Sequence, residues 1–346
     1  MYLSIPNKKQ LKFVLFGHGY NICYFAKLLI DNGFKKPIII THPKKNHERD
    51  RKLLQSNNKL YENVFDLAND LKIPVLETKS VNNENSLKFI RSYGCNIGFS
   101  FSCRSILKKK IIDNLSGKIF NIHPSLLPKE RGGGTFSWRI LQGNTNIAGT
   151  IHLLTEGIDE GAIIMQKEKK LNIANPKPQD FMIETNILFN KLLSDFLISI
   201  NKNKSFKTID QKNSKSTYLP RLYTEVNGAI NWSLLGNEIE RFIRAFSNPY
   251  SGAFTYVGKK RVYIYNAKFI NTKKNNHPFM SGRIINISKT HGAKVLVKDG
   301  LLIINSLRYK NKIINVSDFL SIVDMFSTPL NLLHKASSVV NVSKMT

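Results

Sequence analysis

The sequence predicts an α/β protein with a doubly wound, mostly parallel sheet, followed by a small β-rich domain at the C-terminus. Apolar runs alternate with helical patterns in the first part of the chain, and short alternating strands replace them in the last part. A chain of 346 residues is also too long for one ordinary domain. We therefore expect a first, catalytic domain over residues 1–205, a linker over 206–225 and a β-rich domain over 226–346.

The first domain opens with the apolar run 11–20, which reads as a buried strand, and with helical apolar spacing over 21–33. The other elements expected there are strands over 36–43, 75–78, 95–102, 148–157 and 162–171, and helices over 60–74, 85–93 and 178–201. In a doubly wound sheet, ligands bind beyond the carboxyl ends of the strands. We therefore expect the strand ends near Gly17, Ser102 and His123 to face one rim.

The stretch 202–220 is polar and basic, which is typical of a linker. An amphipathic helix is expected after it, over 237–246. Short apolar runs separated by Gly, Asn and Lys turns then predict an antiparallel, barrel-like β domain. Its expected strands are 253–257, 261–270, 283–287, 294–299 and 301–307, with a helix over 317–325.

The net charge of +28 is the most unusual feature of the composition, and it indicates a polyanionic partner or a phosphate-bearing substrate. The basic residues are spread along the chain, however. The densest runs, Lys108–Lys110 and Lys259–Arg261, are shorter than a nucleic-acid patch requires. We therefore favour a solvated basic surface and expect no nucleic-acid partner.

Several other classes are disfavoured by the sequence. No apolar run approaches the roughly 20 residues of a membrane span, and the N-terminus lacks the order of a signal peptide, so no membrane partner is expected. The cysteines, Cys23, Cys95 and Cys103, have neither metal-site nor disulfide spacing. We expect a cytoplasmic location and no metal.

A Gly17-His18-Gly19 turn follows the first strand, as in dinucleotide-binding proteins. The full G-x-G-x-x-G pattern fails because Ile22 stands where the third glycine belongs, and no acidic residue ends the second strand. A tight strand-to-helix turn is therefore favoured over a nicotinamide or flavin site.

The segment 119–141 carries the strongest chemical signal. Asn121 and His123 share one face of a strand end, so both side chains project toward the rim. Asn offers two N–H donors, and His exchanges a proton near neutral pH. Pro124 stiffens the turn that follows, and three glycines at 132–134 allow close approach of backbone to a ligand.

A carboxylate belongs with this pair. Asp159 lies in a glycine-flanked turn between two apolar strands, where an ordinary turn aspartate is also common. Beside Asn121 and His123, its carboxylate is able to orient and charge the imidazole.

The motif Asn121-x-His123-Pro-Ser-Leu-Leu-Pro-x-x-Arg131-Gly, followed by the Asp159-x-Gly161 turn, resembles the folate-dependent formyltransferase family. That family includes methionyl-tRNA formyltransferase, glycinamide ribonucleotide formyltransferase and the sugar N-formyltransferases. Residues 228–254 are similar to the start of the C-terminal region shared by the tRNA and sugar enzymes. The resemblance covers residues 11–307.

The resemblance implies transfer of a formyl group from N10-formyltetrahydrofolate to an amine, without a metal. Asn121 is then expected to donate to the oxyanion with protonated His123 assisting, and His123 or a water that it holds is expected to relay the proton. Asp159 is expected to orient His123 and to favour its charged form. The residues expected to hold the folate are Arg104, Ile106, Leu107, Gly157 and Asp159.

The identity of the amine divides the family. The glycinamide enzyme lacks the C-terminal half. Three stretches argue against the tRNA enzyme. Residues 16–20 replace a Gly-Thr-Pro ending, and residues 132–138 replace a Gly-Ala-Ala-Pro-like sequence. Residues 41–54, after the second strand, resemble the sugar enzymes at least as well. The global charge and the β domain favour tRNA. A protein that kept the fold and lost activity is a further alternative, disfavoured by the intact motif.

We therefore expect a dTDP-linked 4-amino-4,6-dideoxyhexose, as used for O-antigen, as the acceptor, with methionyl-tRNA as the alternative. For Trp138, core packing competes with stacking on the substrate, and Arg244 is expected either on the surface or at the diphosphate. A homodimer is implied by the family. The expected substrate-binding residues are Ser125, Lys129, Arg131, Gly132, Gly133, Gly134, Thr135, Trp138, Arg244 and Tyr250.

Overall fold

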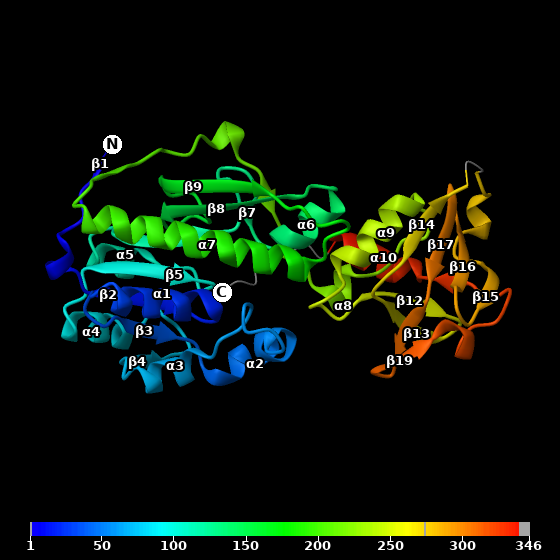
Figure 1. The fold of residues 1–346 in the computed structure, drawn as a ribbon, viewed down its shortest axis with the longest axis horizontal. Coiled ribbons are helices and arrows are strands. Elements are labelled where there is room, and N and C mark those ends of the chain that lie inside the picture. Colours follow the sequence, from blue (N-terminus) through cyan, green and yellow to red (C-terminus); the bar gives the residue numbers. More distant parts are fainter. Residues whose placement is uncertain (1, 273–274, 339–346) are drawn as a thin grey trace.

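The computed structural model describes residues 2–272 and 275–338. Its first domain is built on a seven-stranded sheet with the order β4-β3-β2-β5-β6-β8-β9 (Figure 1). The strands are β2 (Phe13–Gly17), β3 (Ile38–Thr41), β4 (Val75–Glu77), β5 (Ile97–Phe101), β6 (Ile119–His123), β8 (Asn146–Leu153) and β9 (Ile163–Lys170). The first five strands of that order are parallel, and β8 and β9 are antiparallel additions. The expected doubly wound, mostly parallel sheet is confirmed.

Helices cover both faces of this sheet, which explains why its central strands are apolar on both sides. They are α1 (Tyr20–Asp31), α2 (Lys44–Leu54), α3 (Val64–Asp70), α4 (Glu84–Ser92), α5 (Lys109–Asn114), α6 (Thr135–Leu141) and α7 (Pro178–Asn201). On one face, Phe25 of α1 and Phe196 of α7 pack against Phe99. On the other, Leu87 of α4 and Ile111 of α5 belong to a second core.

Three of these helices are absent from the sequence-based prediction, and one is shorter than expected. In α2 a single residue, His47, is buried, so the charged segment shows little of the apolar pattern that predicts a helix. The helices α5 and α6 have only six and seven residues. The helix expected over 60–74 begins at Val64, because the Asn63 side chain accepts from the Phe65 amide and caps it.

The second domain is antiparallel and β-rich, as expected. One sheet has the order β19-β18-β13-β12-β20 and the other β14-β17-β16-β15. The strands are β12 (Ala253–Val257), β13 (Lys260–Ile264), β14 (Lys268–Asn271), β15 (Ile284–Ser288), β16 (Gly292–Val297), β17 (Gly300–Ile304), β18 (Ser306–Tyr309), β19 (Lys312–Asn315) and β20 (Phe326–Ser327). Its helices are α8 (Thr224–Asn227), α9 (Gly236–Ala245) and α10 (Leu330–Ser338).

Two details of that domain differ from the prediction. The single strand expected over 261–270 is divided between the two sheets as β13 and β14. The prediction of a helix over 317–325 is wrong. A 3-10 turn at Val316–Asp318 is followed by irregular chain, in which Val323 has a φ of +78°. That backbone angle is incompatible with a right-handed helix.

The stretch expected to be a linker lies along the first domain rather than spanning open solvent (Figure 1). In it, β10 (Phe206–Lys207) pairs with β1 (Tyr2–Leu3), and β11 (Tyr218–Leu219) pairs with β7 (Arg131–Gly132). Backbone hydrogen bonds hold the segment, and a polar composition does not reveal them. The boundaries 1–205, 206–225 and 226–346 stay a prediction.

The two domains share a buried apolar cluster. Ile140 of α6 and Phe181 of α7 join Ile239 and Ile243 of α9 in it. The Ser137 hydroxyl of α6 also donates to the Ala245 carbonyl at 2.8 Å. The second domain therefore fixes α6, whose first residues border the functional site. Within residues 2–272 and 275–338, no helix combines the length and the apolarity that a membrane span requires.

Candidate active site

Asn121 and His123 lie at the carboxyl end of β6, two residues apart and therefore on the same face of the strand. The neighbouring β8 is antiparallel, and its register sets His152 opposite Asn121 and Thr150 opposite His123. Strand pairing thus brings a second histidine to the expected pair.

His123 is almost fully enclosed, with 4% of its surface exposed. Its Nδ1 lies 3.3 Å from Asp159 Oδ2, and its Nε2 lies 2.8 Å from the Glu130 carbonyl oxygen. Burial lowers the pKa of His123, and the Asp159 carboxylate and the Glu130 carbonyl offset this only in part. Asp159 therefore acts in the expected direction, favouring the charged ring, but burial outweighs it and favours the neutral imidazole, whose Nε2–H donates to the Glu130 carbonyl.

Asp159 sits in the turn between β8 and β9 with a left-handed φ of +53°. The Gln211 side chain holds this turn by donating to the Asp159 and Gly161 carbonyls at 2.8 and 2.7 Å. Burial alone would raise the pKa of the carboxyl group. The two histidines and the Gly132 amide, which donates to Oδ2 at 2.9 Å, instead lower that pKa to about 2. Asp159 is thus a carboxylate at neutral pH.

Glycine is required at two positions around this carboxylate. A Cβ atom at Gly132 would lie 2.4 Å from the Leu219 carbonyl oxygen, and one at Gly161 would lie 1.8 Å from that of Leu153. The glycine at 132 therefore lets the backbone amide reach Asp159 while β7 pairs with β11.

His152 is a site residue that the sequence analysis missed. It is fully buried, its Nδ1 donates to the Leu153 carbonyl at 2.8 Å, and its Nε2 then accepts from Asn121 Nδ2 at 3.1 Å. The same Nε2 lies 3.6 Å from Asp159 Oδ1. His152 lies directly opposite Asn121 in the β-ladder, and that position could have identified it. The position could be predicted only if the register between β6 and β8 were known.

The arrangement combines an amide donor, an imidazole and a carboxylate. One Asn121 N–H is used by His152, which leaves the second N–H to donate to an oxygen that becomes negative during a reaction. His123 is positioned to exchange a proton, and Asp159 fixes its ring. Within the described part of the chain, no group of three His, Cys, Asp or Glu side chains is arranged for a metal ion.

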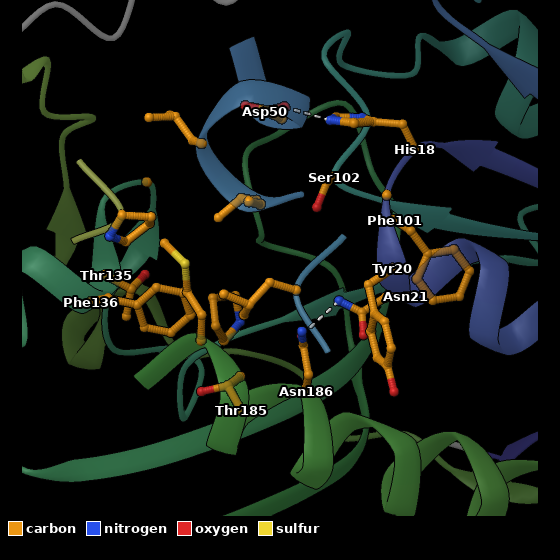
Figure 2. A pocket seen from close by; sticks show the side chains of 18 of the residues that line it. His18, Tyr20, Asn21, Asp50, Phe101, Ser102, Thr135, Phe136, Thr185 and Asn186 are labelled. Carbon is orange, nitrogen blue, oxygen red and sulfur yellow. Dashed lines mark hydrogen bonds and ion pairs between the residues drawn. The ribbon is translucent and has the colours of Figure 1, made fainter. Parts of the chain in front are cut away.

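A cavity of about 420 Å³ lies beyond the strand ends and borders this site. Ile122, Pro124 and Gly132–Thr135 form the wall next to it. Figure 2 shows His18 beside Asp50 at one end of the cavity and Asn21 bonded to Asn186 at another. Its volume and mixed apolar and polar lining are typical of a small-molecule site.

Of the expected substrate-binding residues, five line this cavity. They are Gly132, Gly133, Gly134, Thr135 and Tyr250. Burial raises the pKa of the Tyr250 phenol, so its hydroxyl stays protonated at neutral pH.

The other five expected substrate-binding residues do not line the cavity, and four of them have side chains engaged elsewhere. Ser125 donates to the Lys129 carbonyl, and the Lys129 side chain is exposed. Trp138 donates to the Pro220 carbonyl at 2.7 Å, so it holds the connecting segment. Arg244 contacts Asn175 and Glu240 at 2.9 and 3.3 Å.

Arg131 requires a separate correction, since it was the expected phosphate ligand. It is 5% exposed, and its guanidinium donates to Gln211 at 2.9 Å and to Asn213 at 3.2 Å. Glu160 lies 3.6 Å away. The side chain therefore anchors the connecting segment and is not available to a substrate in the cavity.

One of the expected folate-binding residues lines the cavity, and the other four do not. Arg104 lines the cavity and pairs with Asp50 at 2.6 Å. Leu107 is packed in the core, whereas 38% of the Ile106 side chain is exposed. The segment that follows them meets the 155–161 turn, where the Lys109 amide donates to Glu156 at 3.3 Å. Gly157 and Asp159 belong to this turn.

The fold and the site together define an α/β enzyme class with an Asn-His-Asp set at the sheet rim and a C-terminal β domain. The family model "Formyl transferase" matches residues 10–180, and the model "Formyl transferase, C-terminal domain" matches residues 223–323. The chain belongs to the formyl transferase family.

Two individual relatives are each 28% identical to this chain over the aligned residues. The chain is 28% identical over 298 residues to a methionyl-tRNA formyltransferase of Syntrophus aciditrophicus, covering 85% of this chain and 90% of the relative. It is 28% identical to the bifunctional polymyxin resistance protein ArnA of Wigglesworthia glossinidia brevipalpis, covering 84% of this chain and 47% of that protein. The chain thus spans about half of ArnA.

A solved structure shares the fold. It is an N-formyltransferase from Helicobacter canadensis in complex with folinic acid and dTDP-3-aminofucose. It has a TM-score of 0.62 and 22% identity to this chain, covering 85% of this chain and 98% of the other.

Proposed function

We propose that the chain transfers a formyl group from N10-formyltetrahydrofolate to the amine of a nucleotide-linked amino sugar. The acceptor that the sequence favours is a dTDP-linked 4-amino-4,6-dideoxyhexose of O-antigen synthesis. The proposal rests chiefly on one observation: Asn121, His123 and Asp159 meet beside a cavity of small-molecule size.

The expected folate-binding residues that lie outside the cavity lining are compatible with a folate donor. The exposed Ile106 side chain offers an apolar surface, and the 155–161 turn offers backbone groups beside it. When bound there, the folate supplies the formyl group.

The chain's own residues supply the remaining chemistry. The second N–H of Asn121 donates to the formyl oxygen as negative charge develops on it. Because Nε2–H of neutral His123 donates to the Glu130 carbonyl, its Nδ1 is the atom that accepts the proton released by the attacking amine, directly or through one water. The Asp159 carboxylate fixes the imidazole ring and stabilises the positive charge that the ring then carries.

Two candidate acceptors are compatible with the proposed reaction, a nucleotide-linked amino sugar and methionyl-tRNA. The Helicobacter enzyme holds a dTDP-linked amino sugar in its complex, and it shares this fold over nearly its whole length. The relative from Syntrophus carries the name of the tRNA enzyme, and the net charge of +28 also suits a polyanion. Methionyl-tRNA is therefore the second candidate. The homodimer implied by the family stays a prediction.

The test is a formyl-transfer assay with N10-formyltetrahydrofolate and three acceptors offered in parallel. These are dTDP-4-amino-4,6-dideoxyglucose, dTDP-3-aminofucose and initiator methionyl-tRNA. Transfer to a sugar and not to the tRNA supports the proposal, and the preferred sugar reports the position of the amine. Transfer to the tRNA alone contradicts it. The Asn121→Ala variant, at equal protein concentration, controls for background transfer.

A further inference from the structure

Two arginines reach the cavity with no hydrogen-bonding or ionic partner among the described residues, although Arg221 lies over the Tyr223 ring with 5.8 Å to its centroid. Arg49 belongs to α2, and Arg221 follows β11. Within residues 2–272 and 275–338, neither guanidinium has a hydrogen bond or an ion pair with another side chain or with the backbone. Arg104, the third arginine in the lining, is paired with Asp50.

The cavity has little negative charge to oppose an anionic ligand. Asp50 is the one carboxylate among the described residues that line it. Its Oδ2 lies 2.6 Å from Arg104 and 2.8 Å from His18 Nε2, so its charge is already matched. The charge of Arg49 and Arg221 is left over, and it makes this part of the cavity electropositive.

The two arginines come from distant parts of the sequence but line the same cavity as Tyr250. Tyr250 lies in the cavity wall between the domains. The charges of both Arg49 and Arg221 act on its phenol and oppose the rise in pKa that burial causes. Both guanidinium groups are therefore within electrostatic reach of one aromatic side chain.

Local structure holds each arginine in place. A Cβ atom at Gly133 would lie 3.3 Å from the Arg221 Cβ, so the glycine lets the Arg221 stem lie against the cavity wall. On α2, the neighbouring Arg51 and Lys52 both pair with Glu48, at 2.7 and 3.4 Å. Arg49 is not part of that cluster and contributes to the cavity lining.

We propose that Arg49 and Arg221 form the diphosphate-binding subsite of the acceptor cavity, with the Tyr250 ring beside it. Two planar guanidinium groups suit two adjacent phosphate groups, because each can donate two parallel hydrogen bonds. The subsite commits the acceptor to a nucleoside diphosphate derivative. It rests on the proposed function, and it replaces Arg131 and Arg244, which the structure places elsewhere.

The experiment titrates the full-length protein with dTDP, dTMP and thymidine in a calorimeter. Wild type is expected to bind dTDP tightest. Arg49→Gln and Arg221→Gln each raise the Kd of dTDP roughly ten- to hundredfold, since each removes a charge-assisted hydrogen-bonding group, and leave thymidine binding nearly unchanged. Arg49→Lys and Arg221→Lys recover part of the affinity, because charge remains while the planar fork is lost.

Arg51→Gln is the matched control, since Arg51 lies on the same helix but pairs with Glu48. It is expected to bind dTDP as wild type does. Wild-type affinity for dTDP in both glutamine variants overturns the subsite and leaves the sugar assay, and thus the proposed function, standing. A wild-type protein that formylates methionyl-tRNA and binds no dTDP overturns the proposed function together with the subsite.

Discussion

The functional site has two sides, the surroundings of Asp159 and the cavity beside them. They differ in whether their polar side chains have hydrogen-bonding or ionic partners within the protein. Around Asp159, the buried His123 and His152 and the partly buried Asn121 each have a protein partner. In the cavity, Arg49 and Arg221 have no hydrogen bond or ion pair among the described residues, and Arg221 contacts only the Tyr223 ring face. The first side is preorganised, as chemistry requires, because fixed donors need no rearrangement when charge develops. The second side holds its charges ready for a ligand.

This comparison predicts that changes around Asp159 lower kcat, whereas changes in the cavity raise KM. The largest effect is expected for His123→Asn, which removes the proton acceptor while keeping a polar group of similar size. We expect kcat to fall about 10²- to 10⁴-fold with little change in the KM for the acceptor. Steady-state kinetics with a saturating donor measure this, and the exposed His334→Asn is the control. A rise in KM without a fall in kcat would erase the distinction between the two sides.

The next effect belongs to the oxyanion donor. Asn121→Ala removes the N–H that is left over after the bond to His152, so kcat should fall about 10²- to 10³-fold. Single-turnover transfer measures the chemical step without product release. Unchanged single-turnover rates would show that the amide contributes nothing to the reaction.

A third prediction concerns the acid sensitivity of the cavity wall. Burial is the main cause that lowers the pKa values of His42 and His47 from 6.5 to about 4. The Arg104 amide donates to His42 Nε2 at 3.1 Å, and His47 Nε2 donates to the His42 carbonyl at 2.8 Å. Both neutral rings thus help to hold α2, which carries Arg49.

Since both folded-state pKa values are depressed, the unfolded chain binds more protons below pH 6.5. The stabilisation is present above pH 6.5 and is lost as the pH falls through about 4. Urea unfolding at several pH values measures this loss. His47→Gln should flatten the profile, and the exposed His334→Gln should not. Equal profiles for all three proteins would contradict the assignment.

The smallest effect is expected for His152→Gln. His152 acts through Asn121, whose amide it orients by accepting one neutral hydrogen bond. A bond of that kind contributes about 1 kcal/mol, so kcat should fall roughly five- to tenfold. The acid limb of the kcat profile should stay where His123 places it. A loss as large as that of His123→Asn would instead make His152 the proton acceptor.

The same division explains what could be predicted from the sequence. The alternation of a strand was enough to set Asn121 and His123 on one face, and the apolar runs were enough for the parallel sheet. The partners of side chains were not predictable. Arg131 looked available for phosphate, but the connecting segment folds back and engages it.

His152, Arg49 and Arg221 were missed for a related reason. The importance of His152 depends on the register between β6 and β8. That of the two arginines depends on which basic side chains are left without a carboxylate after folding. Both are tertiary facts, and local sequence patterns do not contain them.

The measurement that tests the account most directly is a double-mutant cycle in formyl transfer to a dTDP-linked amino sugar. It compares wild type, His123→Asn, Arg49→Gln and the double variant. We predict that the first change lowers kcat, the second raises KM, and the losses in kcat/KM multiply, since separate sites act independently. Absence of transfer by the wild type, or losses in the double variant no greater than in either single variant, would contradict the account.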